Sequence, residues 1–141
     1  RGRGDADKRQ PFEDLIEERL FRPLGMRTAS ARLADFEARP DRATLHPLNG
    51  NGGTEPGPNA RTDPAAPAAG ISASLEDMIA WVRFQLASGK LDGRSIVAAD
   101  ALAETHLPQT IISPTVLPGP MAFYGLGWFV LRYPDVTVVF H

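Results

Sequence analysis

The feature that most constrains this sequence is a long segment without periodicity, from about Thr28 to Ala69. Much of it, "HPLNGNGGTEPGPNARTDPAAPAAG", consists of Gly, Pro, Asn and Ala. Such a segment cannot bury enough apolar area on its own to offset the entropy of ordering it. Because structureless loops of this length are uncommon inside compact domains, we expect residues 28–69 to be a loop packed across a larger body.

An amphipathic helix is predicted before this loop, over residues 11–22. Its apolar residues fall at helical spacing on one face, namely Phe12, Leu15, Ile16 and Leu20. Pro11 suits the first turn, because its missing N–H would have no partner there. We expect Pro23 to end the helix and Gly25 to permit a reversal of the chain.

The strongest helical pattern follows the loop and predicts a helix over residues 75–88. The repeating apolar residues are Leu75, Met78, Ile79, Val82 and Leu86. Ser74 is well placed as the N-cap, with Asp77 three residues on as in a capping box. Gly89 is a natural C-terminal stop. A shorter helix is predicted over 98–106, closed by Pro108.

The C-terminal part predicts antiparallel strands. Two runs rich in β-branched and aromatic residues flank Pro134-Asp135, which indicates a hairpin over residues 123–141. Gly125 and Gly127 fall inside the first run and suggest a bulge or a close backbone approach. Helices and loops followed by a sheet predict an α+β fold.

Composition excludes several classes of protein. The formal charge of −2 provides no basic surface for nucleic acid. With no cysteine, disulfides, thiolate zinc sites and cysteine nucleophiles are ruled out. No apolar run approaches the roughly 20 residues that span a bilayer, and the charged start "RGRGDADKRQ" is not a signal peptide. Localisation cannot be inferred from these residues.

A complete nucleophilic centre is not found in the sequence. A Ser-x-x-Lys element is absent, because Asp5 and Ala87 stand three residues before Lys8 and Lys90. In "GISAS", Ser72 comes near a Gly-x-Ser-x-Gly elbow, but Ser74 stands where the second Gly is required. We therefore regard Ser72 as a weak nucleophile candidate and favour a loop or capping role.

The three histidines do not have the spacing of a metal site. His46, His106 and His141 are far apart, and no His-Glu-x-x-His element exists. His46 lies in a polar segment, and His106 lies near a helix end, where a cation stabilises the helix dipole. We expect no metal and no other cofactor.

Four segments in order resemble one family of enzymes. "PFEDLIEERLFRPLGM", "PAAGISASLEDMIAWVRFQLASGKLDG", "FYGLGWFV" and "VTVVFH" are similar to segments of the serine hydrolases grouped with class C β-lactamases, D-alanyl-D-alanine carboxypeptidases and related esterases. The resemblance covers about residues 10–141, which we interpret as a partial domain truncated at both ends. Residues 1–9 do not match and form a charged tail.

The resemblance implies acyl transfer through a serine ester, on a peptide, an ester or a lactam. The family's Ser-x-x-Lys and Tyr-x-Asn motifs would precede Arg1, since Tyr124 and Tyr133 are followed two residues later by Leu126 and Asp135. His141 matches the first residue of the third motif, a Lys or His followed by Thr or Ser and then Gly. The resemblance gives His141 a place beside the nucleophile, where it shapes and polarises the pocket.

Three interpretations stay open. The chain is a fragment of a serine hydrolase that is inactive alone, a non-catalytic binding module derived from that fold, or one half of a split enzyme. The partners expected are a small-molecule or peptide substrate and the remaining N- and C-terminal parts of the domain. Family members are often periplasmic or secreted and sometimes cytoplasmic, so the resemblance does not decide localisation.

Overall fold

The computed structural model describes residues 11–59, 63–113 and 121–141. Helices and antiparallel strands are both present, which confirms the α+β fold class. The chain forms two compact units, Arg1–Trp81 and Val82–His141, and the boundary falls inside helix α6 (Leu75–Leu86). In the described part of the chain, no helix has the length and apolar character needed to cross a membrane.

A continuous helical run opens the first unit. It consists of α2 (Phe12–Ile16), the π-helical turn η1 (Glu17–Phe21) and α3 (Arg22–Leu24). The prediction that Pro23 ends this helix is wrong, because the run continues through Pro23 to Leu24. A proline ring crowds the carbonyl one turn earlier and offers that carbonyl no N–H. The turn before Pro23 is wider than an α-helical one, since the N–H of Arg22 donates to the carbonyl of Glu17 five residues back. Gly25 then reverses the chain with φ +70°.

Short helical pieces interrupt the predicted loop over residues 28–69. They are α4 (Leu33–Glu37), the 3-10 turn η2 (Asp63–Ala65) and α5 (Ala66–Ala69). A long-range contact anchors the first of them, since the backbone N–H of Leu33 donates to Asp63 Oδ1 at 2.9 Å. Ala66 is buried at the start of α5. The segment is therefore held near both of its ends, by the hydrogen bond between Leu33 and Asp63 and by the burial of Ala66.

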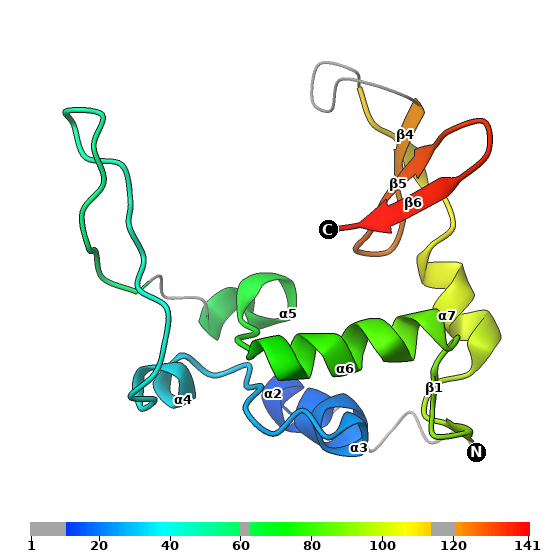
Figure 1. Ribbon diagram of the computed structural model, residues 1–141, viewed down its shortest axis with the longest axis horizontal. Helices are drawn as coiled ribbons and strands as arrows, with labels where there is room; N and C mark the ends of the chain where they lie inside the picture. The colour runs from blue at the N-terminus through cyan, green and yellow to red at the C-terminus, as the bar shows by residue number, and fades with distance from the viewer. Residues whose placement is uncertain (1–10, 60–62, 114–120) are drawn as a thin grey trace. The chain divides into compact units, whose positions relative to one another are not determined.

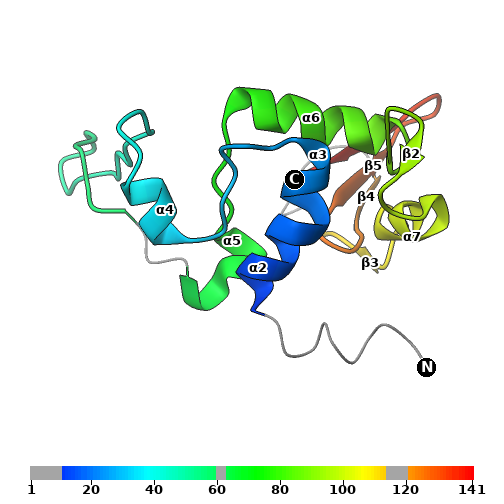
Figure 2. The same cartoon turned by 90° about the horizontal axis from the view of Figure 1, so that it is seen from below.

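Two extended segments, one at each end of this loop, run side by side (Figure 2). Ser30 and Ser72 form an antiparallel bridge in which each backbone N–H donates to the other residue's carbonyl, at 3.0 and 2.8 Å. The bridge joins the end of the first helical run to the entry of α6 and closes the loop between them.

Helix α6 begins with the capping box that the sequence predicts. The N–H of Asp77 donates to Ser74 Oγ at 3.3 Å, and the N–H of Ser74 donates to Asp77 Oδ2 at 3.4 Å. After the helix, Gly89 has φ +82° and its N–H donates to the carbonyl of Phe84 at 3.1 Å. Apolar stripes of the kind that predicted this helix normally face a core. Here all five members of the stripe are exposed, and Asp77 and Phe84 are buried instead.

The second unit carries the strands. A small hairpin is formed by β1 (Lys90–Leu91) and β2 (Arg94–Ser95), followed by α7 (Ala99–Thr105). The main sheet is antiparallel, in the order β3 (Thr110–Ile111), β4 (Met121–Tyr124), β5 (Phe129–Arg132) and β6 (Thr137–Phe140). Figure 1 shows β4, β5 and β6 as neighbouring arrows, with the C-terminus at the end of β6. Strands β5 and β6 form the hairpin predicted around Pro134-Asp135.

The two glycines of "YGLGW" lie in a turn between β4 and β5, so the prediction of one strand through both of them is wrong. The prediction of a close backbone approach is confirmed at Gly125. A Cβ there would lie 2.6 Å from the carbonyl oxygen of Thr105 and 3.0 Å from that of Leu107. Gly127 instead has φ +86°, a left-handed conformation that β-carbons disfavour.

Candidate functional site

An aromatic row crosses the end of the sheet at which the chain terminates. Cross-strand pairing places Tyr124 opposite Phe129, and Phe129 opposite Phe140. The rings of Tyr124 and Phe129 meet edge to face with centroids 5.0 Å apart, and those of Phe129 and Phe140 stack at 5.2 Å and 19°. Directly opposite residues of an antiparallel sheet share one face, so the three rings form a continuous apolar row.

His141 follows this row at the end of β6. Its ring centroid lies 5.9 Å from that of Phe129 and 6.4 Å from that of Tyr124. The residue is exposed, so the imidazole rests beside an aromatic surface and remains open to solvent. An imidazole placed in this way can donate a hydrogen bond to a ligand that packs on the aromatic row.

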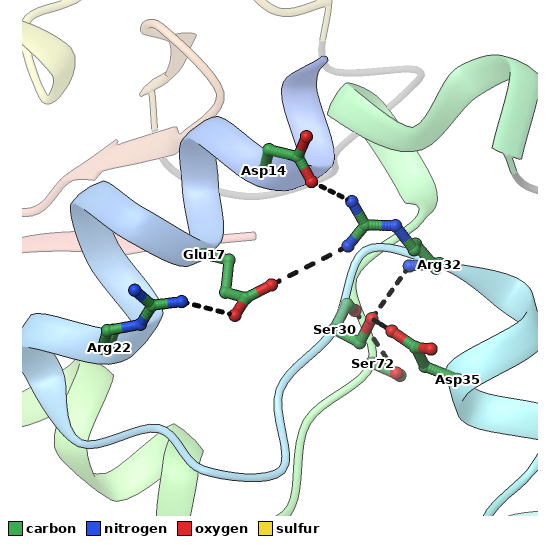
Figure 3. Close-up of polar contacts among 7 residues, drawn as sticks. All are labelled: Asp14, Glu17, Arg22, Ser30, Arg32, Asp35 and Ser72. Atoms are coloured by element: carbon green, nitrogen blue, oxygen red, sulfur yellow. Dashed lines mark hydrogen bonds and ion pairs between the residues drawn. The ribbon is translucent and has the colours of Figure 1, made fainter. Parts of the chain in front are cut away.

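A polar cluster in the first unit surrounds Ser30 (Figure 3). The hydroxyl of Ser30 donates to Asp35 Oδ2 at 2.6 Å and accepts from the N–H of Arg32 at 3.1 Å. Arg32 also forms ion pairs with Asp14 and, at 3.8 Å, with Glu17, which in turn accepts from Arg22 at 3.0 Å. The cluster ties the start of α4 to the first helical run.

Ser72 lies beside this cluster and has no basic partner in the described structure. Its hydroxyl donates to the carbonyl of Ser30 at 3.4 Å, a long contact to a backbone acceptor. An activated serine needs an adjacent base such as His or Lys. The geometry therefore agrees with the loop role favoured for Ser72.

Asp77 is the most buried acid among the described residues, at 4% exposure. Besides Ser74, its Oδ2 accepts from the N–H of Thr28 at 3.1 Å and from the Thr28 hydroxyl. The capping role was visible in the sequence. The bond to Thr28 was missed, because no local pattern links residues 49 positions apart.

A pocket of about 600 Å³ lies where α6 begins. Phe36 and Leu75 contribute apolar surface to it, and Arg39 and Arg42 contribute cationic side chains. Ser72 and Ser74 are also part of its wall. No sequence pattern pointed to this pocket, since its walls come from the first part of the long loop and from the entry of α6, which are far apart in sequence.

The other histidines have structural surroundings. His46 is exposed and its Nδ1 lies 2.8 Å from the carbonyl oxygen of Thr44. His106 is the C-cap of α7, and its ring meets Trp128 edge to face at 5.2 Å. Across residues 11–59, 63–113 and 121–141, no group of three His, Cys, Asp or Glu side chains is arranged to hold a metal ion.

Comparison with known proteins explains this architecture. The family model described as beta-lactamase matches residues 4–141. The chain therefore belongs to the beta-lactamase family, as the four resembling segments predict. This match begins before residue 10, where those segments start.

A solved structure with the same arrangement is the octameric penicillin-binding protein homologue from Pyrococcus abyssi. It superposes with a TM-score of 0.70 at 18% sequence identity, which at this level shows similarity of fold. The match covers 92% of this chain and 27% of that chain, so the present chain spans about a quarter of the length of this relative. A search of curated proteins gives no match.

Proposed function

We propose that this chain forms part of the active-site domain of a serine hydrolase that acts on a peptide, an ester or a lactam through an acyl-enzyme. Membership of the beta-lactamase family supports the reaction class. The observation that carries the proposal is the position of His141 at the end of β6, beside the aromatic row Tyr124, Phe129 and Phe140.

In this proposal the acyl group of the substrate lies along the aromatic row and the reacting carbonyl lies near His141. The imidazole supplies a hydrogen-bond donor at the edge of the aromatic row, where negative charge develops on the substrate as the serine attacks. The row excludes water from one side of the acyl group. The position of the ring supports this role, because its centroid lies 5.9 Å from that of Phe129 in the aromatic row.

The attacking oxygen comes from residues outside this chain. Ser-x-x-Lys and Tyr-x-Asn do not occur in its sequence, and Ser72 lacks a base in the described residues. The purified 141-residue chain is therefore expected to form no covalent adduct with a fluorophosphonate or penicillin reagent. Such an adduct would overturn the proposal.

The positive test combines the chain with a companion polypeptide that carries Ser-x-x-Lys and Tyr-x-Asn, taken from the neighbouring coding sequence. We expect labelling of the companion serine and ester or lactam hydrolysis only in the mixture. His141→Ala is expected to lower kcat/KM by at least about tenfold, as for loss of one donor to a developing oxyanion. His46→Ala is the matched control, since His46 is exposed and lies outside the sheet, and it should leave kcat/KM unchanged.

A non-catalytic binding module is the second candidate. The pocket of about 600 Å³ at the start of α6 favours it, because its walls offer apolar surface from Phe36 and Leu75 beside the cations Arg39 and Arg42, a combination that can bind a ligand without catalysis. A chain that stays monomeric and folded alone, and that gives no labelling with the companion, would support this candidate over the hydrolase.

A further inference from the structure

Helix α6 has two opposite faces of different exposure. Asp77 and Phe84, seven residues apart on one face, are 4% and 0% exposed. The opposite face carries five large apolar side chains at helical spacing: Leu75 at 73%, Met78 at 44%, Ile79 at 50%, Val82 at 49% and Leu86 at 82% exposure. We call these five residues the α6 stripe.

The α6 stripe is too continuous for an ordinary protein surface. Single exposed apolar residues need no explanation, but a contiguous row marks an interaction surface. A helix that is buried on one side and apolar on the other is typical of a helix inside a larger core. Glu76 and Arg83, also seven residues apart, border the stripe along one side and give it a polar edge there, as at the rim of an interface.

The fold comparison indicates what covers this face. The chain matches the Pyrococcus abyssi homologue over 92% of its own length but over 27% of the other chain, so that homologue contains further polypeptide beyond the matched part. The geometry points to the α6 stripe as the docking face for the remaining part of the beta-lactamase domain, an inference that rests on the proposed function. The occupant is an apolar helix or sheet face of the polypeptide that carries Ser-x-x-Lys and Tyr-x-Asn.

The test measures the affinity of the 141-residue chain for this companion polypeptide by calorimetry, without reference to activity. The variant is Val82→Glu combined with Leu86→Glu, which places two charges in the centre and at the end of the stripe. We expect at least a hundredfold increase in Kd, because carboxylates would be desolvated on docking. Circular dichroism should show unchanged helix content, since both side chains are exposed.

The matched control is Leu48→Glu. Leu48 is 79% exposed, close to the 82% of Leu86, and belongs to the long loop and not to α6. It should leave Kd unchanged. Equal affinity of the α6 double variant and the native chain would overturn the inference. So would failure of the native chain to bind the companion, whether it stays monomeric or instead pairs with a second copy through the stripe.

The experiments distinguish failure of the docking inference from failure of the proposed function. If the native chain binds the companion through the α6 stripe but the complex neither labels nor hydrolyses, the docking face stands and the proposed function fails. If the complex is active and the double variant binds normally, the function stands and the docking inference fails.

Discussion

Thr28 and Asp77 are joined across 49 residues by two hydrogen bonds to one carboxylate oxygen, from the backbone N–H and from the hydroxyl of Thr28. The same oxygen accepts from the N–H of Ser74. One buried carboxylate thus caps α6 and holds the segment that follows the first helical run. Hydrogen bonds to charged groups are stronger than neutral ones, so this contact organises the first unit.

Replacing Asp77 with Ala should destabilise the first unit by about 2–3 kcal/mol, because three part-buried donors lose their carboxylate acceptor together. Urea unfolding followed by circular dichroism measures the change. Asp41→Ala serves as control, since Asp41 is exposed and lies in the loop, and it should shift the free energy of unfolding by less than about 0.5 kcal/mol. Equal effects of the two substitutions would contradict the role assigned to Asp77.

Gly125→Ala should destabilise the second unit by about 1–3 kcal/mol, the usual cost of overpacking. The added methyl group would lie 2.6 Å from the carbonyl oxygen of Thr105, and that oxygen already accepts the N–H of Leu126 at 3.0 Å. Neither backbone group can move without loss of this bond. Thermal unfolding checks the expectation. Gly50→Ala is the control, because a Cβ at Gly50 meets nothing within 4 Å.

Ser30 and Ser72 face each other through the backbone but should respond differently to substitution. The buried hydroxyl of Ser30 bonds to Asp35 at 2.6 Å and to the N–H of Arg32, so Ser30→Ala should cost about 1–3 kcal/mol. Ser72→Ala removes only a 3.4 Å contact and should cost less than about 0.5 kcal/mol. Ser72→Ala should also leave covalent labelling of the assembled domain unchanged, and loss of labelling would identify Ser72 as the nucleophile.

Local sequence patterns correctly predicted those structural features that depend on interactions between residues close together in sequence. The capping box of Ser74 and Asp77, the stop at Gly89 and the hairpin around Pro134-Asp135 depend on residues near one another in sequence, and each is present. The predicted helix end at Pro23 was wrong because a wider turn accommodates the proline. Single-residue preferences do not predict such a turn.

Non-local relationships were the part that the sequence could not supply. The bridge between Ser30 and Ser72 and the bond from Thr28 to Asp77 depend on how distant segments meet. The candidate site divides in the same way. His141 was found through a family motif. Its distance from Tyr124 depends instead on the register of the strands, which becomes known only from the folded sheet.

The stacked pair Phe129 and Phe140 offers a direct measure of how firmly β6 is held next to His141. Their rings lie 5.2 Å apart at 19°, and an aromatic pair of this kind contributes about 0.5–1.5 kcal/mol beyond area burial. A double-mutant cycle with Phe129→Ala and Phe140→Ala should therefore give a coupling energy of about 1 kcal/mol in thermal or urea unfolding. The pair Phe129 and Thr137, which is not directly paired, provides the control cycle and should give coupling near zero. Coupling near zero for Phe129 and Phe140 would mean that the aromatic row does not fix β6, and that His141 is positioned by other contacts.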